Sequence, residues 1–114
     1  MSGDVVALCA RHPEPGAMLA ALRAAGPDLR VDVREDGGLI QLYDERELLV
    51  SVEAPRLVQV PGEVERLLGI PGPVETPLWW VEARVPALGR GISTVHRLVA
   101  ALVSVTGGTT WQSR

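Results

Sequence analysis

The stretch Leu78–Val85, LWWVEARV, has the strongest β-strand pattern in the chain. Successive side chains of a strand point to opposite faces of its sheet. One face therefore carries Trp79, Val81, Ala83 and Val85, and the other carries Leu78, Trp80, Glu82 and Arg84. Because both faces begin with large apolar side chains, we expect this strand to lie near the centre of a sheet.

A long amphipathic helix is predicted after this strand, beyond a loop over 86–91. Its apolar residues recur at a spacing of three or four, and they are Ile92, Val95, Leu98, Val99, Leu102, Val103 and Thr106. We expect this to be the main helix of the core, packed by the face that holds Leu102. The glycines at 107–108 end the helix, and residues 109–111 have the β propensity of a last short strand.

A buried strand and a shorter helix are predicted near the start of the chain. Residues 4–10, DVVALCA, form a continuous apolar run of strand length. Pro13 and Pro15 then permit a helix to begin. Apolar side chains follow at helical spacing until Gly26 and Pro27 stop the pattern, and they are Met18, Leu19, Leu22 and Ala25.

Residues 29–53 alternate between apolar and polar side chains, which is the period of half-buried strands. Polar turns at 36–38 and 44–46 divide this segment into three strands. The inward positions are Leu29, Val31, Val33, Ile40, Leu42, Leu48, Val50 and Val52. Since one face of this antiparallel meander is apolar and the other mostly polar, we expect helices to cover only one side of the sheet.

The segment between the meander and the central strand is rich in proline and glycine. Residues 57–60 are predicted to be extended, 62–68 to form a short helix, and 70–73 to form a loop. The whole chain, 1–114, is then a single α+β domain. We expect a small sandwich with an antiparallel or mixed sheet of five to six strands, in the order βα-βββ-α-βα-β, with helices mainly on one face.

The composition is that of one globular domain. Its 114 residues suffice for one hydrophobic core, and no run approaches the ~20 apolar residues that a membrane span needs. Cys9 is the only cysteine, which excludes an internal disulfide and fits a reducing compartment. The first apolar run lacks the pattern of a secretion leader, so we expect a cytoplasmic location.

The charges do not indicate nucleic-acid binding, just as the apolar runs do not indicate a membrane span. The net charge is −3, and residues of both signs are interspersed along the chain, so no basic stripe is offered to phosphates. Every basic residue is Arg, while Lys, Asn and Phe are absent. A genome rich in GC codons explains that pattern, so the composition indicates a high-GC bacterium. The high Arg content is therefore not evidence of phosphate recognition.

One loop has a feature of an anion site. Gly89, Arg90 and Gly91 precede Ser93 at the start of the predicted helix, where backbone N–H groups and the helix dipole favour an anion. The spacing matches no phosphate-binding loop, and Ser93 or Thr94 beside a helix start is ordinarily a cap. Both interpretations stay open, with the cap favoured.

The sequence offers little for catalysis or metal binding. The only histidines are His12 and His96, and a zinc site would need Cys9 and carboxylates to complete it. A Cys9 nucleophile with a histidine base has no accompanying motif, and a thiol in an apolar strand is usually inert. Carboxylates flanking the turns, such as Glu65, are interpreted as solubilising surface. We expect no metal and no cofactor.

The adjacent tryptophans Trp79 and Trp80 must face opposite sides of the sheet. One of them can enter the core beneath the helices, and the other needs an explanation. It is covered either by the proline-rich segment 70–77 or by a partner, because Trp and Arg are enriched in protein interfaces. If helices cover one side only, an apolar patch centred on Trp80 remains on the other side.

These patterns predict a non-catalytic protein-protein interaction module. Its partner surface is predicted at Leu78, Trp80, Glu82 and Arg84, where it binds a second copy of the chain, as a homodimer, or another protein. The alternative is a small enzyme or ligand-binding protein with a pocket between the sheet and the helices. Its polar groups would then be Arg84, Glu82 or His96.

Overall fold

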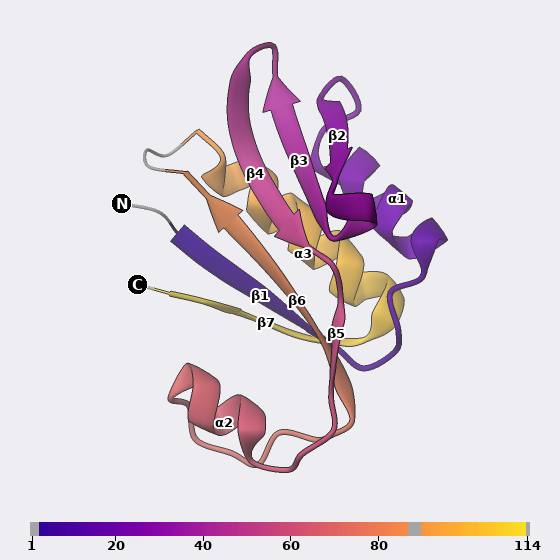
Figure 1. Ribbon diagram of the computed structural model, residues 1–114. Coiled ribbons are helices and arrows are strands. Elements are labelled where there is room, and N and C mark those ends of the chain that lie inside the picture. The colour runs from indigo at the N-terminus through magenta and orange to yellow at the C-terminus, as the bar shows by residue number, and fades with distance from the viewer. Residues whose placement is uncertain (1–2, 87–89, 114) are drawn as a thin grey trace.

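The computed structural model describes residues 3–86 and 90–113 (Figure 1). The elements follow the chain in the order β1 (Gly3–Cys9), α1 (Pro15–Ala25), β2 (Arg30–Arg34), η1 (Glu35–Gly37), β3 (Leu39–Asp44), β4 (Glu47–Glu53), β5 (Arg56–Val58), α2 (Glu63–Leu68), β6 (Leu78–Val85), α3 (Ile92–Thr106) and β7 (Gly108–Gln112). The predicted α+β class is confirmed. The predicted strand 78–85 and helix 92–106 have the observed bounds.

The strands form one open antiparallel sheet with the spatial order β2-β3-β4-β6-β1-β7. β4 and β5 pair with successive parts of β6, so that Val52 lies opposite Ala83 and Leu57 lies opposite Trp79. In the described part of the chain, the sheet has seven strands rather than the predicted five to six, because the extended segment after Pro55 pairs as a true strand. β6 occupies the interior position that its apolar faces predict.

The main core lies between the sheet and the helices α1 and α3, which cover the same face (Figure 1). α1 packs along α3, and small residues such as Ala21 and Ala25 at its buried face allow the two helices to approach closely. The sheet contributes Val81, Ala83 and Val85 from β6, and α3 contributes Leu98 and Leu102. The alternation of β6 thus places its second, fourth, sixth and eighth residues in or against this core.

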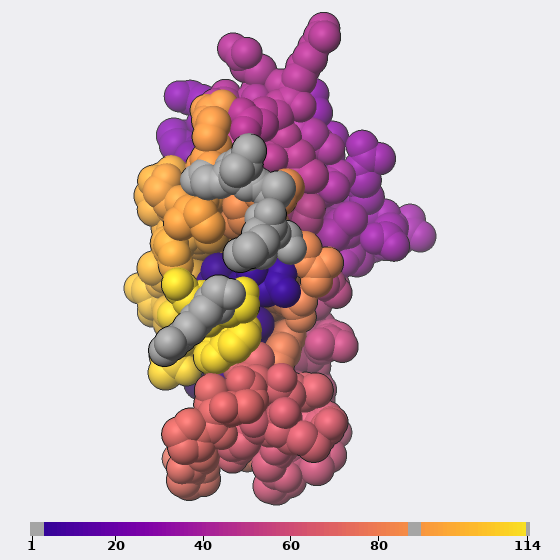
Figure 2. Space-filling view, turned by 90° about the vertical axis from the view of Figure 1, so that its left-hand side faces the viewer, coloured from indigo at the N-terminus to yellow at the C-terminus, as the bar shows by residue number. Residues whose placement is uncertain are grey.

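A second, smaller core lies on the opposite face of the sheet, and it corrects the expectation that helices cover one side only. Its buried residues are Val6, Leu8, Val64, Leu78 and Trp80, to which Ile70 and Val74 add partly buried side chains. α2 and the chain on either side of it form this cover and the lower end of the molecule (Figures 1 and 2). Helices therefore lie mainly on one face, with α2 as the exception.

Glu65 holds the cover of the second core together. Its Oε2 atom accepts a hydrogen bond from the backbone N–H of Val74 at 3.0 Å, and its carbonyl accepts one from Ile70 at 3.2 Å. The side chain leans against Gly72, where a Cβ atom would collide with the carboxylate. The interpretation of Glu65 as solubilising surface is therefore wrong, since it ties α2 to the loop that follows.

β2 is an edge strand, and its apolar side chains are less covered than the alternation predicts. Val31 is 43% exposed and Val33 is 63% exposed, although both point to the helix-covered face beside Leu42 and Ile40. Leu29 packs against the main core as expected. The helices do not extend far enough to cover the last strand, so β2 keeps an exposed apolar face.

Gly108 lets β7 follow α3 immediately and pair with β1. Its φ is +119°, a conformation that favours glycine, and a Cβ atom there would collide with the carbonyl oxygen of Leu8. Gly107, also at positive φ, ends α3. The two glycines thus turn the chain from the helix straight into the sheet.

Candidate functional site

The residues predicted as a partner surface are divided between the second core and the polar sheet face. Leu78 and Trp80 are each only 5% exposed, beneath α2 and the segment that follows it. Glu82 and Arg84 lie further along the same face of β6, beyond this cover. The expectation of an uncovered patch centred on Trp80 is therefore wrong, because α2 and the 70–77 segment cover it.

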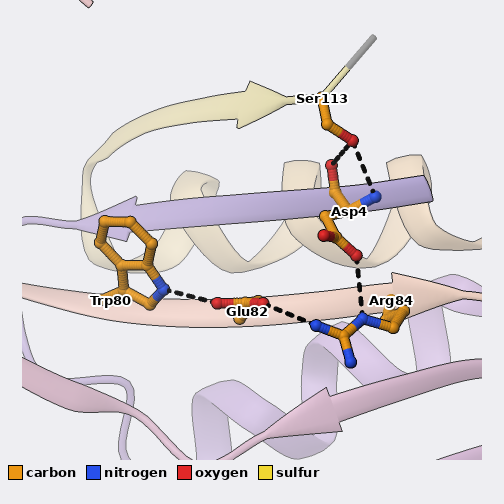
Figure 3. A network of polar contacts seen from close by, with 5 residues as sticks. All are labelled: Asp4, Trp80, Glu82, Arg84 and Ser113. Carbon is orange, nitrogen blue, oxygen red and sulfur yellow. Dashed lines mark hydrogen bonds and ion pairs between the residues drawn. The ribbon is translucent and has the colours of Figure 1, made fainter. Parts of the chain in front are cut away.

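The polar members of this set form a network with the ends of β1 and β7 (Figure 3). Trp80 Nε1 donates to Glu82 Oε1 at 3.2 Å, and Arg84 donates to Glu82 Oε2 at 3.2 Å. Arg84 Nε also donates to Asp4 Oδ1 at 2.9 Å. Asp4 and Ser113 exchange hydrogen bonds through the Asp4 backbone and the Ser113 hydroxyl. The network thus joins β6, β1 and β7.

The Arg84 guanidinium is engaged by the two carboxylates of this network. The hydrogen bond and charge of Asp4 raise the pKa of the Arg84 guanidinium, with a further contribution from Glu82. Arg84 also lines a shallow polar hollow with Ser51 and Glu53, on the sheet face away from α1 and α3. That hollow does not lie between the sheet and the helices, where the enzyme alternative places its pocket. His96 is exposed on α3.

In the predicted anion loop, the Arg90 side chain binds carboxylates of the same chain. Arg90 donates to Asp44 Oδ2 at 2.8 Å and also to Glu47, so two acids compensate its charge. Gly91 is the N-cap residue of α3 and, as glycine, has no side chain with which to cap the helix. Ser93 is exposed, and Gly89 lies outside the described residues. Arg90 and Ser93 border one hollow together with Arg97, but the Arg90 guanidinium there is engaged by Asp44 and Glu47.

Cys9 and His12 do not form a catalytic pair in this arrangement. Cys9 is buried in the main core, and burial raises the pKa of its thiol, partly offset by a hydrogen bond with Thr106. The ring of His12 lies against Trp79, with ring centroids 4.1 Å apart. Among residues 3–86 and 90–113, no group of three or more His, Cys, Asp or Glu side chains could hold a metal ion.

The buried position of Cys9 predicts that native protein resists thiol reagents. Labelling by an uncharged maleimide should become fast only when denaturant unfolds the chain, because reaction needs an accessible thiolate.

Cys9→Ala should cost ~1 kcal/mol of unfolding free energy through a small cavity. Stability should also fall as pH rises past the ordinary thiol pKa, because the unfolded chain then releases a proton that the folded chain retains. Rapid labelling of native protein would contradict this assignment.

An apolar groove beside α1 is a feature that the sequence did not predict. We call it the α1 groove, and its volume is about 410 Å³. One wall comes from α1 and the turn before it, and the other from β3 and the bend between β4 and β5. The lining residues are His12, Pro13, Pro15, Met18, Leu19, Leu22, Gly37, Ile40, Glu53, Ala54 and Pro55.

The groove arises where α1 begins. Pro13 and Pro15 lead the chain into the helix, and Pro55 bends the opposite strand as β4 passes into β5. Met18 and Leu22 close the floor and are nearly buried, while Leu19, one residue on, is 50% exposed at the wall. The helical spacing of the apolar residues predicts that Leu19 lies in the core. Its exposure depends on where α1 sits over the sheet, which periodicity does not specify.

Comparison of the chain with models of protein families, with characterised proteins and with solved structures finds no match. None of the helices in the described ranges has the length and apolar composition that crossing a bilayer requires.

Proposed function

We propose that this protein is a non-catalytic protein-protein interaction module that binds an apolar segment of its partner in the α1 groove. The observation that carries the proposal is the apolar lining of this groove. Leu19, Ile40 and Pro15 present side chains that neither core covers completely. Apolar grooves of this kind bind the apolar face of a partner helix or an extended segment.

The charges around the groove specify the partner further. Glu53 is the acid among its lining residues, at the end of β4. Glu14 and Glu35 lie next to the lining but border neighbouring hollows that also contain Arg11 and Arg84. The bound segment should therefore carry apolar side chains with Arg or Lys at the end that meets Glu53, because complementary charges steer association and fix orientation.

The volume limits how much of a partner can enter. About 410 Å³ is at the small end of the range of ~300–1,000 Å³ for ligand pockets, so the groove accommodates a few side chains. The same volume is the observation that favours the alternative function, a protein that binds a small apolar ligand between α1 and the sheet. The two functions differ in whether a peptide of the right charge binds.

The test of the α1 groove compares substitutions of two leucines that have nearly the same exposure, one inside the groove and one outside it. A short helical peptide of Leu and Lys, with Leu on one face, should bind the protein, and Leu19→Gln should weaken binding about tenfold by removing one buried contact. Leu67→Gln on α2 is the matched control, because Leu67 has nearly the same exposure, 48%, outside the α1 groove. Calorimetric titration measures both affinities.

Three outcomes decide between the functions. Equal losses in Leu19→Gln and Leu67→Gln would contradict the assignment to the α1 groove. Equal binding of a Leu and Glu peptide with the same pattern would contradict the proposed charge preference. If the uncharged probe N-phenyl-1-naphthylamine binds in a manner that depends on Leu19 while the Leu and Lys peptide does not, the small-ligand alternative replaces the interaction module.

A further inference from the structure

We infer that β2 pairs antiparallel with β2 of a second copy of the chain, about a two-fold axis that passes beside Val31. This surface is separate from the α1 groove, and the inference does not depend on what the groove binds. Among the described residues, β2 has β3 as its only neighbouring strand. Alternate N–H and C=O groups of such an edge point away from the sheet and can accept another strand.

The first observation is the apolar side of β2. Val31 and Val33 stand on the same face as Leu42 and Ile40, their partners in β3. Leu42 is fully buried, whereas Val31 and Val33 are largely uncovered. The apolar face of the sheet therefore continues beyond the helices to its edge. A second copy joined at β2 extends the sheet and covers these two valines.

The second observation is the alternation of charge on the other side of β2. Arg30 Nε lies 3.4 Å from Asp32 Oδ1, and Arg34 Nη2 lies 3.7 Å from Asp32 Oδ2. One carboxylate is thus shared by two guanidiniums, which remain mostly exposed. A further carboxylate, Asp28, precedes the strand. The edge carries an ordered row of opposite charges that a second row can complement.

Charge complementarity selects one register. With Val31 opposite Val31 of the second copy, Arg30 faces Asp32 of the other chain, and by symmetry this pair occurs twice. Asp28 and Leu29, the counterparts of Arg34 and Val33, lie in the turn before β2, so the ladder proper comprises residues 30–32 of each copy. Opposite charges directly across a ladder stabilise it, and like charges destabilise it. Every side chain of this short ladder meets one of suitable chemistry.

The neighbouring registers are less favourable. If the axis passes beside Asp32, that carboxylate meets its own copy, and Arg30 meets Arg34 of the second chain. If the axis passes beside Val33, Asp32 faces Arg34 of the other chain twice, but Val31 then faces the acid Glu35, which has a φ of 55° outside the strand conformation. With the axis beside Val31, each Val33 instead lies next to the apolar Leu29. A small interface of this kind predicts a weak dimer that depends on protein concentration.

Disulfide trapping tests the register. Val31→Cys should give a covalent dimer under mild oxidation, because directly opposed Cβ atoms lie ~5 Å apart in a ladder, close to disulfide geometry. Val33→Cys is the matched control on the same face and strand. In the proposed register it lies ~13 Å from its own copy, since four residues separate them along the strand. It should give no covalent dimer, and Cys9 stays buried in both variants.

Light scattering at increasing protein concentration measures the association without a cross-link. The wild-type mass should rise from 12.2 kDa toward twice that value. Asp32→Arg should weaken association about fivefold, because two symmetry-related pairs become repulsive. The double variant Arg30→Asp with Asp32→Arg should restore it, since the pairs return with exchanged signs. Circular dichroism should stay unchanged throughout, because these side chains contribute little to either core.

A constant mass of 12.2 kDa up to sub-millimolar concentration, with no cross-link through Val31→Cys, would overturn the inference. So would a dimer whose association is the same in Asp32→Arg as in the wild type, because its interface must then lie elsewhere. A cross-link through Val33→Cys instead of Val31→Cys would contradict the register.

Discussion

Trp80→Ala should lower the free energy of unfolding by about 3–5 kcal/mol, the range for removing a buried aromatic side chain. Trp80 is the largest buried residue of the second core, packed with Val64 and Leu78 between the sheet and α2. Its truncation also leaves Glu82 without the hydrogen bond from Nε1. The loss of stability should first affect α2, because few other contacts hold that helix to the sheet.

Urea unfolding followed by circular dichroism measures this change, and hydrogen exchange of the α2 amides locates it. Leu67→Ala, at an exposed position of the same helix, is the control and should change stability by less than ~0.5 kcal/mol. A loss below ~1 kcal/mol in Trp80→Ala would show that this side chain is not a buried anchor. The partner surface centred on Trp80 that the sequence predicts would then be the better explanation.

Leu102→Ala should cost about 2–5 kcal/mol, because it opens a cavity at the centre of the main core. Leu102 is fully buried on the face of α3 that packs against α1 and the sheet. Unlike the loss at Trp80, this loss should affect the whole domain, since α1, α3 and the sheet meet there. A single unfolding transition with a lowered midpoint is the expected result.

Val105→Ala provides the control on the same helix. Val105 is 49% exposed, and alanine favours a helix slightly more than valine, so its stability change should lie within ~0.5 kcal/mol of zero. If Leu102→Ala also falls within that range, α3 packs only at the periphery, and the assignment of the main core is wrong.

The sequence predicted the elements that carry a strong periodic pattern. The strand 78–85 and the helix 92–106 have the predicted bounds because alternation and helical spacing run through each of them without a break. The short helix after Pro61 was also predicted, since a glycine ends it at Gly69 with φ of 65°. Local chemistry determines each of these three elements.

Features that depend on how elements meet were left open by the sequence or were not predicted. For Trp80 the sequence allowed a cover by the segment 70–77 or by a partner, and it did not predict that α2 joins that segment on the same sheet face. The exposure of Leu19 and Val33 depends on how far α1 and α3 reach across the sheet. Arg90 forms ion pairs with Asp44 and Glu47, which lie on a hairpin distant in the sequence. Each of these outcomes is a long-range contact, which a single sequence does not encode as a local pattern.

The position of β1 has a consequence for how the chain folds as it is made. β1 precedes every other strand of the described chain, yet its two neighbours in the sheet, β6 and β7, are the last two. Ribosomal synthesis therefore releases the apolar residues 5–8 long before any strand that can hydrogen-bond to them. Pairings so distant in sequence fold slowly and leave apolar segments exposed in the meantime. The nascent chain must keep β1 from aggregating until β6 emerges.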